Sequence, residues 1–301
     1  MNFSIFLKLH LSVLIAGFTG LFGRLVSLNA FWITFFRLFF GWITFRIYMA
    51  LSGRSRKCDL KSRIKLMAAG AVLACHLSLF ILSIKLSNVS IGVLTLSSIS
   101  FFIAIIEPSV NHCRFSFMDI GFSLIAMLGL FCIFSFDTNS RLGICVGILC
   151  SLLDAIYATW NKRLVASGIS DSYNMLMMQF DGAVIFMCFA LCVYRSVFGE
   201  WDFYFNIKDF IYLLFAGTIC TAGLYFLQLQ ILKGISAFTM MLTYNLEPVY
   251  SIILAMIIFD ESKELNFSFY IGVACIVISI SLKTWKVYRQ TKLDPALKAR
   301  S

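Results

Sequence analysis

Long apolar runs separated by short polar segments fill this chain from end to end. Ten of these runs have about the length that a helix needs to cross a bilayer. They cover residues 5–23, 30–50, 66–86, 90–110, 117–136, 142–162, 172–194, 209–230, 236–258 and 267–286. The pattern therefore predicts an all-α polytopic membrane protein with ten transmembrane helices.

Two halves of five helices echo each other weakly. Similar triplets recur in the same order: Arg24-Leu25-Val26 with Arg163-Leu164-Val165, and Phe115-Ser116-Phe117 with Phe267-Ser268-Phe269. Because five is odd, the second half must enter the membrane with the opposite orientation, and inverted repeats of this kind recur in secondary transporters. We therefore expect repeats at 1–137 and 138–287, a site near the midplane between them, and a basic cytoplasmic tail at 288–301.

Composition and charge support a membrane protein rather than a nucleic-acid-binding one. The chain is 60% hydrophobic and 13% charged, with a net charge of +10. With the N-terminus inside, sixteen lysines and arginines fall on the inner side and only six on the outer side: Arg24, Lys85, Arg141, Arg195, Lys208 and Lys263. By the positive-inside rule we expect a multi-pass protein of the cell inner (plasma) membrane, with both termini cytoplasmic and membrane lipid as a partner.

Motifs for catalysis or metal binding are missing from the sequence. Its ten cysteines form no CxxC pair, its three histidines form no HExxH, and neither GxSxG nor GxxxxGK[ST] occurs. A cysteine inside an apolar run behaves as a small hydrophobic residue. We therefore expect no enzyme, no metal site and no cofactor.

Polar residues inside the predicted helices are the candidates for function, since such groups are costly in lipid. Arg37 lies in helix 2, Asp181 in helix 7, and Glu247, which precedes Pro248, in helix 9. The proline frees a backbone carbonyl near Tyr244 and favours a kink. Two interpretations remain open for Arg37: a role in transport, or an interhelical pair with Glu107, Asp181 or Glu247. Polar stripes at helical spacing also include Asp154, Tyr157 and Asn161 on helix 6 and Thr221, Tyr225 and Gln228 on helix 8.

These residues resemble the EamA-type branch of the drug/metabolite transporter superfamily. The strongest stretch runs from Ser236-Ala237-Phe238-Thr239 through Asn245-Leu246-Glu247-Pro248-Val249-Tyr250 to Asp260-Glu261. Arg37 resembles the arginine commonly found in helix 2 of that family. Asn161-Lys162-Arg163 and Glu107-Pro108 also resemble a bacterial subgroup, notably from Bacteroidetes. The first half departs from this pattern, because it has no counterpart of Glu261. The resemblance implies ten helices as two inverted five-helix repeats and export of small metabolites.

The leading hypothesis is a secondary transporter that exports small metabolites, such as amino acids or related amphipathic solutes, by alternating access. In it Arg37 attracts an anionic group, and Glu247 or Asp181 carries a proton. The candidate substrate-binding residues are Arg37, Tyr157, Trp160, Tyr225, Gln228, Tyr244 and Glu247. The alternatives are a flippase for a lipid or lipid-linked substrate and a non-transport membrane assembly protein. A monomer and a homodimer are both compatible with the sequence.

Overall fold

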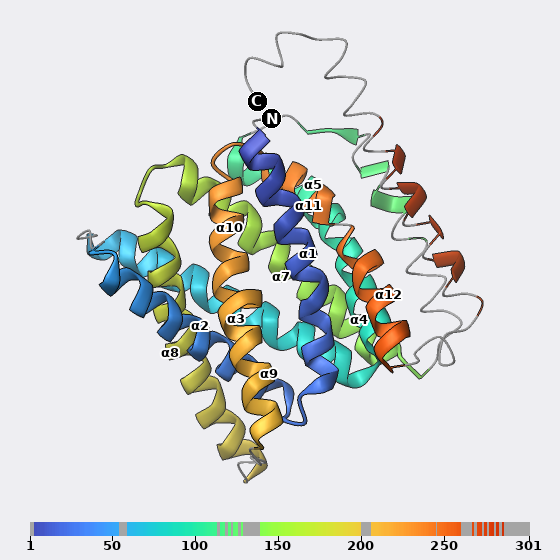
Figure 1. Cartoon of the computed structure of the whole chain (residues 1–301). Coiled ribbons are helices and arrows are strands. Elements are labelled where there is room, and N and C mark those ends of the chain that lie inside the picture. Colours follow the sequence, from blue (N-terminus) through green and yellow to red (C-terminus); the bar gives the residue numbers. More distant parts are fainter. Residues whose placement is uncertain are drawn as a thin grey trace.

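The protein folds into a bundle of helices in the computed structural model (Figure 1). The structure describes residues 3–53, 59–112, 139–199, 206–244 and 246–259, with scattered positions between 115 and 128 and between 267 and 285. Within these ranges all regular structure is helical, and seven helices are long and apolar enough to cross a membrane. The described residues thus form a polytopic membrane protein.

The helices follow the predicted apolar runs closely. Seven membrane-length helices coincide with the first four predicted spans and with 142–162, 172–194 and 209–230. The predicted helices 117–136 and 267–286 and the tail 288–301 lie wholly or largely outside the described residues. The elements are α1 (Phe3–Leu25), α2 (Ala30–Leu51), α3 (Leu60–Leu86), α4 (Val89–Thr95), η1 (Leu96–Ser98), α5 (Ile99–Asn111), α7 (Arg141–Ala166), α8 (Ser172–Phe198), α9 (Ile207–Gly217), η2 (Thr218–Gly223), α10 (Leu224–Ile231), α11 (Ala237–Tyr244) and α12 (Glu247–Phe259).

Asparagine and aspartate side chains cap the starts of several helices. The side chain of Asn29 accepts from the backbone N–H of Trp32, and Asp59 accepts from that of Ser62. The Ser62 hydroxyl and its backbone N–H lower the pKa of Asp59 by stabilising the carboxylate. With this cap α3 begins at Leu60, earlier than the predicted 66, and carries exposed charged residues in its first turns.

Three of the spans are not continuous α-helices. A 3₁₀ segment, η1, joins α4 to α5, and a π-helical segment, η2, joins α9 to α10. The predicted helix 236–258 is divided between α11 and α12, and Pro248 lies in the first turn of α12, where its missing N–H costs no intrahelical bond. The kink expected at Pro248 is thus a break between two short helices.

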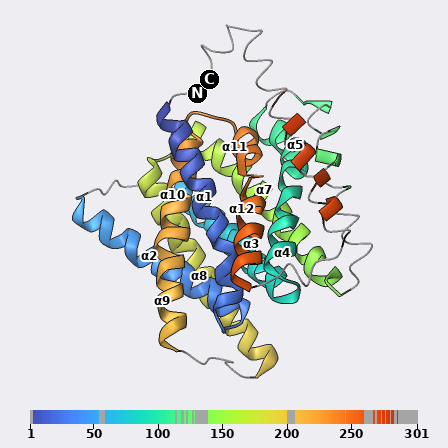
Figure 2. The same ribbon diagram turned by 45° about the vertical axis from the view of Figure 1, so that its right-hand side comes forward.

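The two parts of the chain pack against each other in a matching way. α1 contacts α12 as α7 contacts α5, and α2 contacts α9 as α8 contacts α3. In both views α1 runs between α10 and α12 (Figures 1 and 2). Each part therefore contributes helices to the same interior, and α2 and α8 meet directly.

Two glycine pairs allow the closest of these helix contacts. A Cβ added to Gly41 on α2 would lie 2.9 Å from the carbonyl oxygen of Gly217 on α9, and one added to Gly217 would lie 2.8 Å from that of Arg37. On the other side Gly70 of α3 meets the backbone of Gln179, and Gly182 of α8 meets that of Met67. Small residues at such crossings let two backbones approach closely in membrane helices.

Candidate functional site

Arg37 is a buried guanidinium without an acidic partner among the described residues. Its side chain is 1% exposed on the inner face of α2. Its Nε donates to Thr221 Oγ1 at 3.4 Å, whereas Nη1 and Nη2 have no hydrogen-bond partner in the described part of the chain. An unpaired buried charge is costly, so this arrangement favours a ligand that supplies negative charge.

The π-helical segment η2 forms the surface that Arg37 faces. The wider turn places the Thr221 hydroxyl 2.9 Å from the carbonyl oxygen of Ala216, five residues earlier. Gly217, which precedes the segment, lets the backbone of α2 come close at Arg37. Single π-helical turns are rare and occur frequently at functional sites.

Two carboxyl groups face the same interior. Glu247 is buried at the start of α12, and Asp154 lies partly buried on α7. Electrostatic interactions link Glu247 with Asp154 and with Arg37. Within the described ranges neither acid forms an ion pair with Arg37, so the predicted interhelical pair of Arg37 with Glu247 is not present.

Aromatic side chains surround these charges. Tyr157 and Tyr225 pack edge to face with ring centroids 5.8 Å apart, and the Tyr225 hydroxyl lies 3.0 Å from His76 Nε2. The Tyr157 hydroxyl donates to Gln179 Oε1 at 2.9 Å. Both hydroxyls are therefore occupied by protein groups, which leaves mainly the ring faces to meet a ligand.

The other candidate residues differ in their burial and in whether their polar groups have hydrogen-bond partners. Tyr244 on α11 is buried, and its hydroxyl has no hydrogen-bond partner among the described residues. Gln228 on α10 is buried and interacts with Tyr244, and Trp160 is partly buried against the aliphatic core around Leu164. The structure thus brings Arg37, Tyr157, Tyr225, Gln228, Tyr244 and Glu247 to one interior, linked by contacts and electrostatic interactions.

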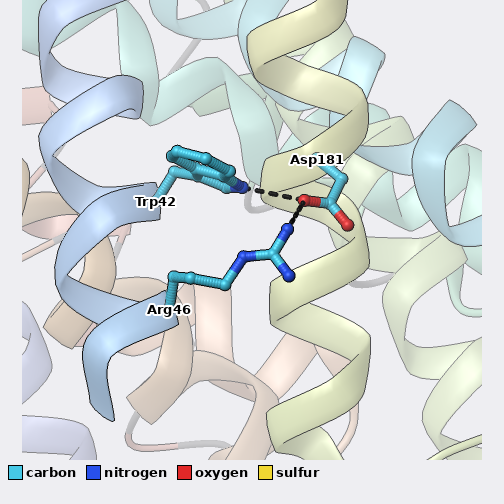
Figure 3. A network of polar contacts seen from close by, with 3 residues as sticks. All are labelled: Trp42, Arg46 and Asp181. Carbon is cyan, nitrogen blue, oxygen red and sulfur yellow. Dashed lines mark hydrogen bonds and ion pairs between the residues drawn. The ribbon is translucent and has the colours of Figure 1, made fainter. Parts of the chain in front are cut away.

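Asp181 has a different setting from the other candidate residues. It accepts a hydrogen bond from Trp42 Nε1 at 2.8 Å and forms an ion pair of 3.3 Å with Arg46 Nη2 (Figure 3). The Arg46 side chain is 56% exposed, and its guanidinium carbon lies 5.2 Å from the centroid of the Trp42 ring. The pairing of Asp181 with Arg37, one of the alternatives left open by the sequence, is therefore not formed: the partner of Asp181 is Arg46.

Glu107 also has a structural role that differs from the predicted pair with Arg37. Its carboxylate accepts from the backbone N–H groups of Ala237 at 3.1 Å and Phe238 at 3.0 Å, at the start of α11. Lys162 donates to the carbonyl oxygens of Leu232 at 2.9 Å and Ile235 at 2.7 Å. Glu107 and Lys162 therefore hold the turn between α10 and α11 against α5 and α7.

Sequence patterns point only weakly to three residues that shape this region. Arg46 is a charge inside a predicted helix, but its acidic partner depends on the contact between α2 and α8. Thr19 and Gln179 are single polar residues in apolar runs, and only their burial, at 6% and 0% exposure, marks them. In the described part of the chain no three His, Cys, Asp or Glu side chains gather as a metal site.

Comparison with known proteins gives a family match over part of the chain and a similar fold. Residues 141–285 match the model of the EamA-like transporter family. No curated protein matches the sequence. Among 25 matching chains of solved structures, one crystal structure of a protein shares 14% identity with a TM-score of 0.68, over 96% of this chain and 99% of that one. At this identity the likeness shows the fold alone.

Proposed function

We propose, from the match of residues 141–285 to the EamA-like transporter family, that this protein is a secondary transporter that exports small metabolites, such as amino acids or related amphipathic solutes, by alternating access. Arg37 is the observation that carries the proposal. Two of its nitrogens have no hydrogen-bond partner in the described part of the chain, whereas in a purely structural contact an acid or a carbonyl would satisfy them. It suits a site that a substrate fills and leaves.

The packing of the helices supports alternating access. The Gly41–Gly217 crossing joins α2 to α9, and the Gly70–Gly182 crossing joins α3 to α8, in matching places of the two parts. Such a correspondence is expected of two inverted five-helix repeats, at 1–137 and 138–287. Exchange of conformation between two similar halves opens a central site to alternate sides of the membrane.

The position of Glu247 supports a role in proton coupling. Glu247 begins α12 directly after the break between α11 and α12, and broken helices line the sites of many transporters. Glu247 is therefore the first candidate to carry a coupled proton. We place the protein in the inner membrane with both termini cytoplasmic, as a monomer or homodimer among membrane lipids.

A flux measurement in proteoliposomes tests the transport function. Purified protein is reconstituted, and uptake and efflux of a labelled metabolite panel are followed with and without a pH gradient. Saturable flux that depends on the protein supports the proposal and identifies the substrate. The absence of flux for every compound, from folded and correctly inserted protein, would contradict it.

A flippase for an amphiphile is the second candidate, and one surface feature favours it. A wholly apolar groove lies between α1 and the helix formed by α9 and η2, lined by Leu14, Ile15, Phe18, Phe215, Ile219 and Cys220. Cys220 is buried and interacts with Arg37, so an acyl chain in the groove would lie near the charged interior. Protein-dependent movement of a fluorescent lipid between leaflets, without flux of any water-soluble metabolite, would favour this function.

A further inference from the structure

Two buried polar residues occupy matching places in the two parts of the molecule. Arg37 lies on α2 and Gln179 on α8, with exposures of 1% and 0%. The carbonyl of each is the point that a glycine of a neighbouring helix approaches: Gly217 at Arg37 and Gly70 at Gln179. Arg37 and Gln179 are therefore structural counterparts.

Gln179 is satisfied by side chains of α7. Its Oε1 accepts from the Tyr157 hydroxyl at 2.9 Å, and its Nε2 donates to Asn161 Oδ1 at 2.6 Å. Tyr157 and Asn161 are themselves buried, each 2% exposed. The protein closes this position with its own groups and leaves no demand for a ligand.

Arg37 lacks the corresponding partners. The triplets Arg24-Leu25-Val26 and Arg163-Leu164-Val165 place Tyr157 opposite Phe18, since each lies six residues before its arginine (163 − 157 and 24 − 18), and Thr19 follows Phe18 on α1. The Thr19 hydroxyl is buried and has no hydrogen-bond partner in the described residues. The first part of the molecule thus has a phenylalanine and a short threonine where the other part has a tyrosine that reaches its partner.

Both unsatisfied groups meet the same segment of the chain. Arg37 donates from Nε to Thr221, and Thr19 lies beside the neighbouring Cys220 thiol, both in η2. Arg37 Nη1, Arg37 Nη2 and Thr19 Oγ1 are all donors that can serve an anionic oxygen. These three donors lie by the same segment η2 and have no partner among the described residues, so they favour an acceptor from outside the protein.

We propose that Arg37 and Thr19 form a subsite for a substrate carboxylate, and that its counterpart at Gln179 and Tyr157 is closed by the protein itself. This inference rests on the proposed transport function and specifies which chemical group the substrate presents. A planar carboxylate matches the two terminal nitrogens of a guanidinium. A doubly charged phosphate fits less well, because Glu247 and Asp154 interact electrostatically in the same interior.

A swap of side chains between the two parts tests the subsite. The double variant Arg37→Gln with Thr19→Tyr installs the residues of the closed position. The probe is benzoate, the neutral control is benzamide, and the readout is the melting temperature of the purified protein. We expect benzoate to stabilise the wild type and benzamide to have no effect. The double variant should fold and lose affinity for benzoate by about tenfold to a hundredfold, since charge-assisted hydrogen bonds are removed.

Single variants keep the test decisive if the double variant fails to fold. Thr19→Val removes the hydroxyl at nearly constant volume and should weaken benzoate binding, whereas Thr19→Ser should retain it. Arg46→Gln, at the exposed pair on the same helix, should bind benzoate like the wild type. Equal stabilisation by benzoate and benzamide, or wild-type response in Thr19→Val, would overturn the subsite.

The result of the benzoate test can be distinguished from the result of the flux measurement. Flux of a metabolite without a benzoate response would remove the carboxylate subsite and leave the transporter in place. A benzoate response that the Thr19→Val variant weakens, in a protein without flux, would establish the subsite and remove the transport function.

Discussion

Two arginines of α2 stand in opposite situations. Arg37 is buried and has no acidic partner in the described residues, whereas Arg46 is exposed and pairs with Asp181. They are nine residues apart (46 − 37), which turns an α-helix by about two and a half turns and places them on opposite faces. The same residue type on one helix therefore serves an inner site in one case and a helix contact in the other, and burial with pairing separates the two.

The largest expected difference between these arginines is in transport. Arg37→Ala should lower the initial rate of flux about a hundredfold, because the charged hydrogen bonds to the substrate are lost. Arg46→Ala should lower it less than about threefold, since a partly exposed pair contributes little. Flux per inserted protein in proteoliposomes measures both. Equal losses would remove the distinction between the two arginines.

The acids near the two arginines should differ in the response to pH. Glu247 has no ion pair within the described ranges, whereas Asp181 is held by Arg46 and Trp42. If Glu247 carries the proton, Glu247→Gln should lower the flux driven by a pH gradient about tenfold. If Glu247 has only a structural role, the response to the gradient should be unchanged. Asp181→Asn should keep the gradient response. The opposite pattern, measured with and without the gradient, would assign the proton to Asp181.

A glycine between the two arginines should disturb only the inner one. Gly41→Ala places a methyl group against the carbonyl of Gly217, so α2 must move away from α9 close to Arg37. We expect a loss of stability of about 1–3 kcal/mol from overpacking. Gly121→Ala is the matched control, because nothing lies within 4 Å of an added Cβ there. Thermal unfolding in detergent compares the two, and an unaffected Gly41→Ala protein would contradict the close crossing.

The smallest expected effect concerns the outer pair itself. A double-mutant cycle with Arg46→Gln and Asp181→Asn isolates the interaction between these side chains. We expect a coupling of about 0.5–1 kcal/mol, since the Arg46 side chain is 56% exposed. A coupling several times larger in unfolding measurements would mean that this pair is a principal contact between α2 and α8.

The apolar pattern was sufficient to predict most of the helices, because the length and composition of an apolar run identify a membrane span. The boundaries of α2 and the start of α8 followed the predicted 30–50 and 172–194 closely. The segments η1 and η2 were not predicted. Thr218–Gly223 contains small and apolar residues that suit an ordinary helix, and the wider turn depends on contacts with α2 that a single sequence does not contain.

The candidate site was predictable in its residues but not in its pairings. Arg37 and Glu247 stood out as charges inside apolar runs, and both are buried. Which acid meets which base depends on how α2, α5 and α8 are placed, so the partners of Asp181 and Glu107 could not be read from spacing. The contrast between the unpartnered Thr19 hydroxyl and the hydrogen-bonded Tyr157 hydroxyl depends on how the helices pack, which residue spacing does not show.

The segment η2 also determines which face of α10, the helix that follows it, points inward. A π-helical turn holds one residue more than an α-helical one, so everything after it is rotated by about 100° relative to an uninterrupted helix. Removal of one residue from Thr218–Gly223 would shorten the span by only about 1.5 Å. It would nevertheless swing Tyr225 and Gln228 out of the interior. The number of residues in η2 therefore determines how α10 is rotated about its axis. A deletion in this segment would alter the site by rotating its residues rather than by replacing them.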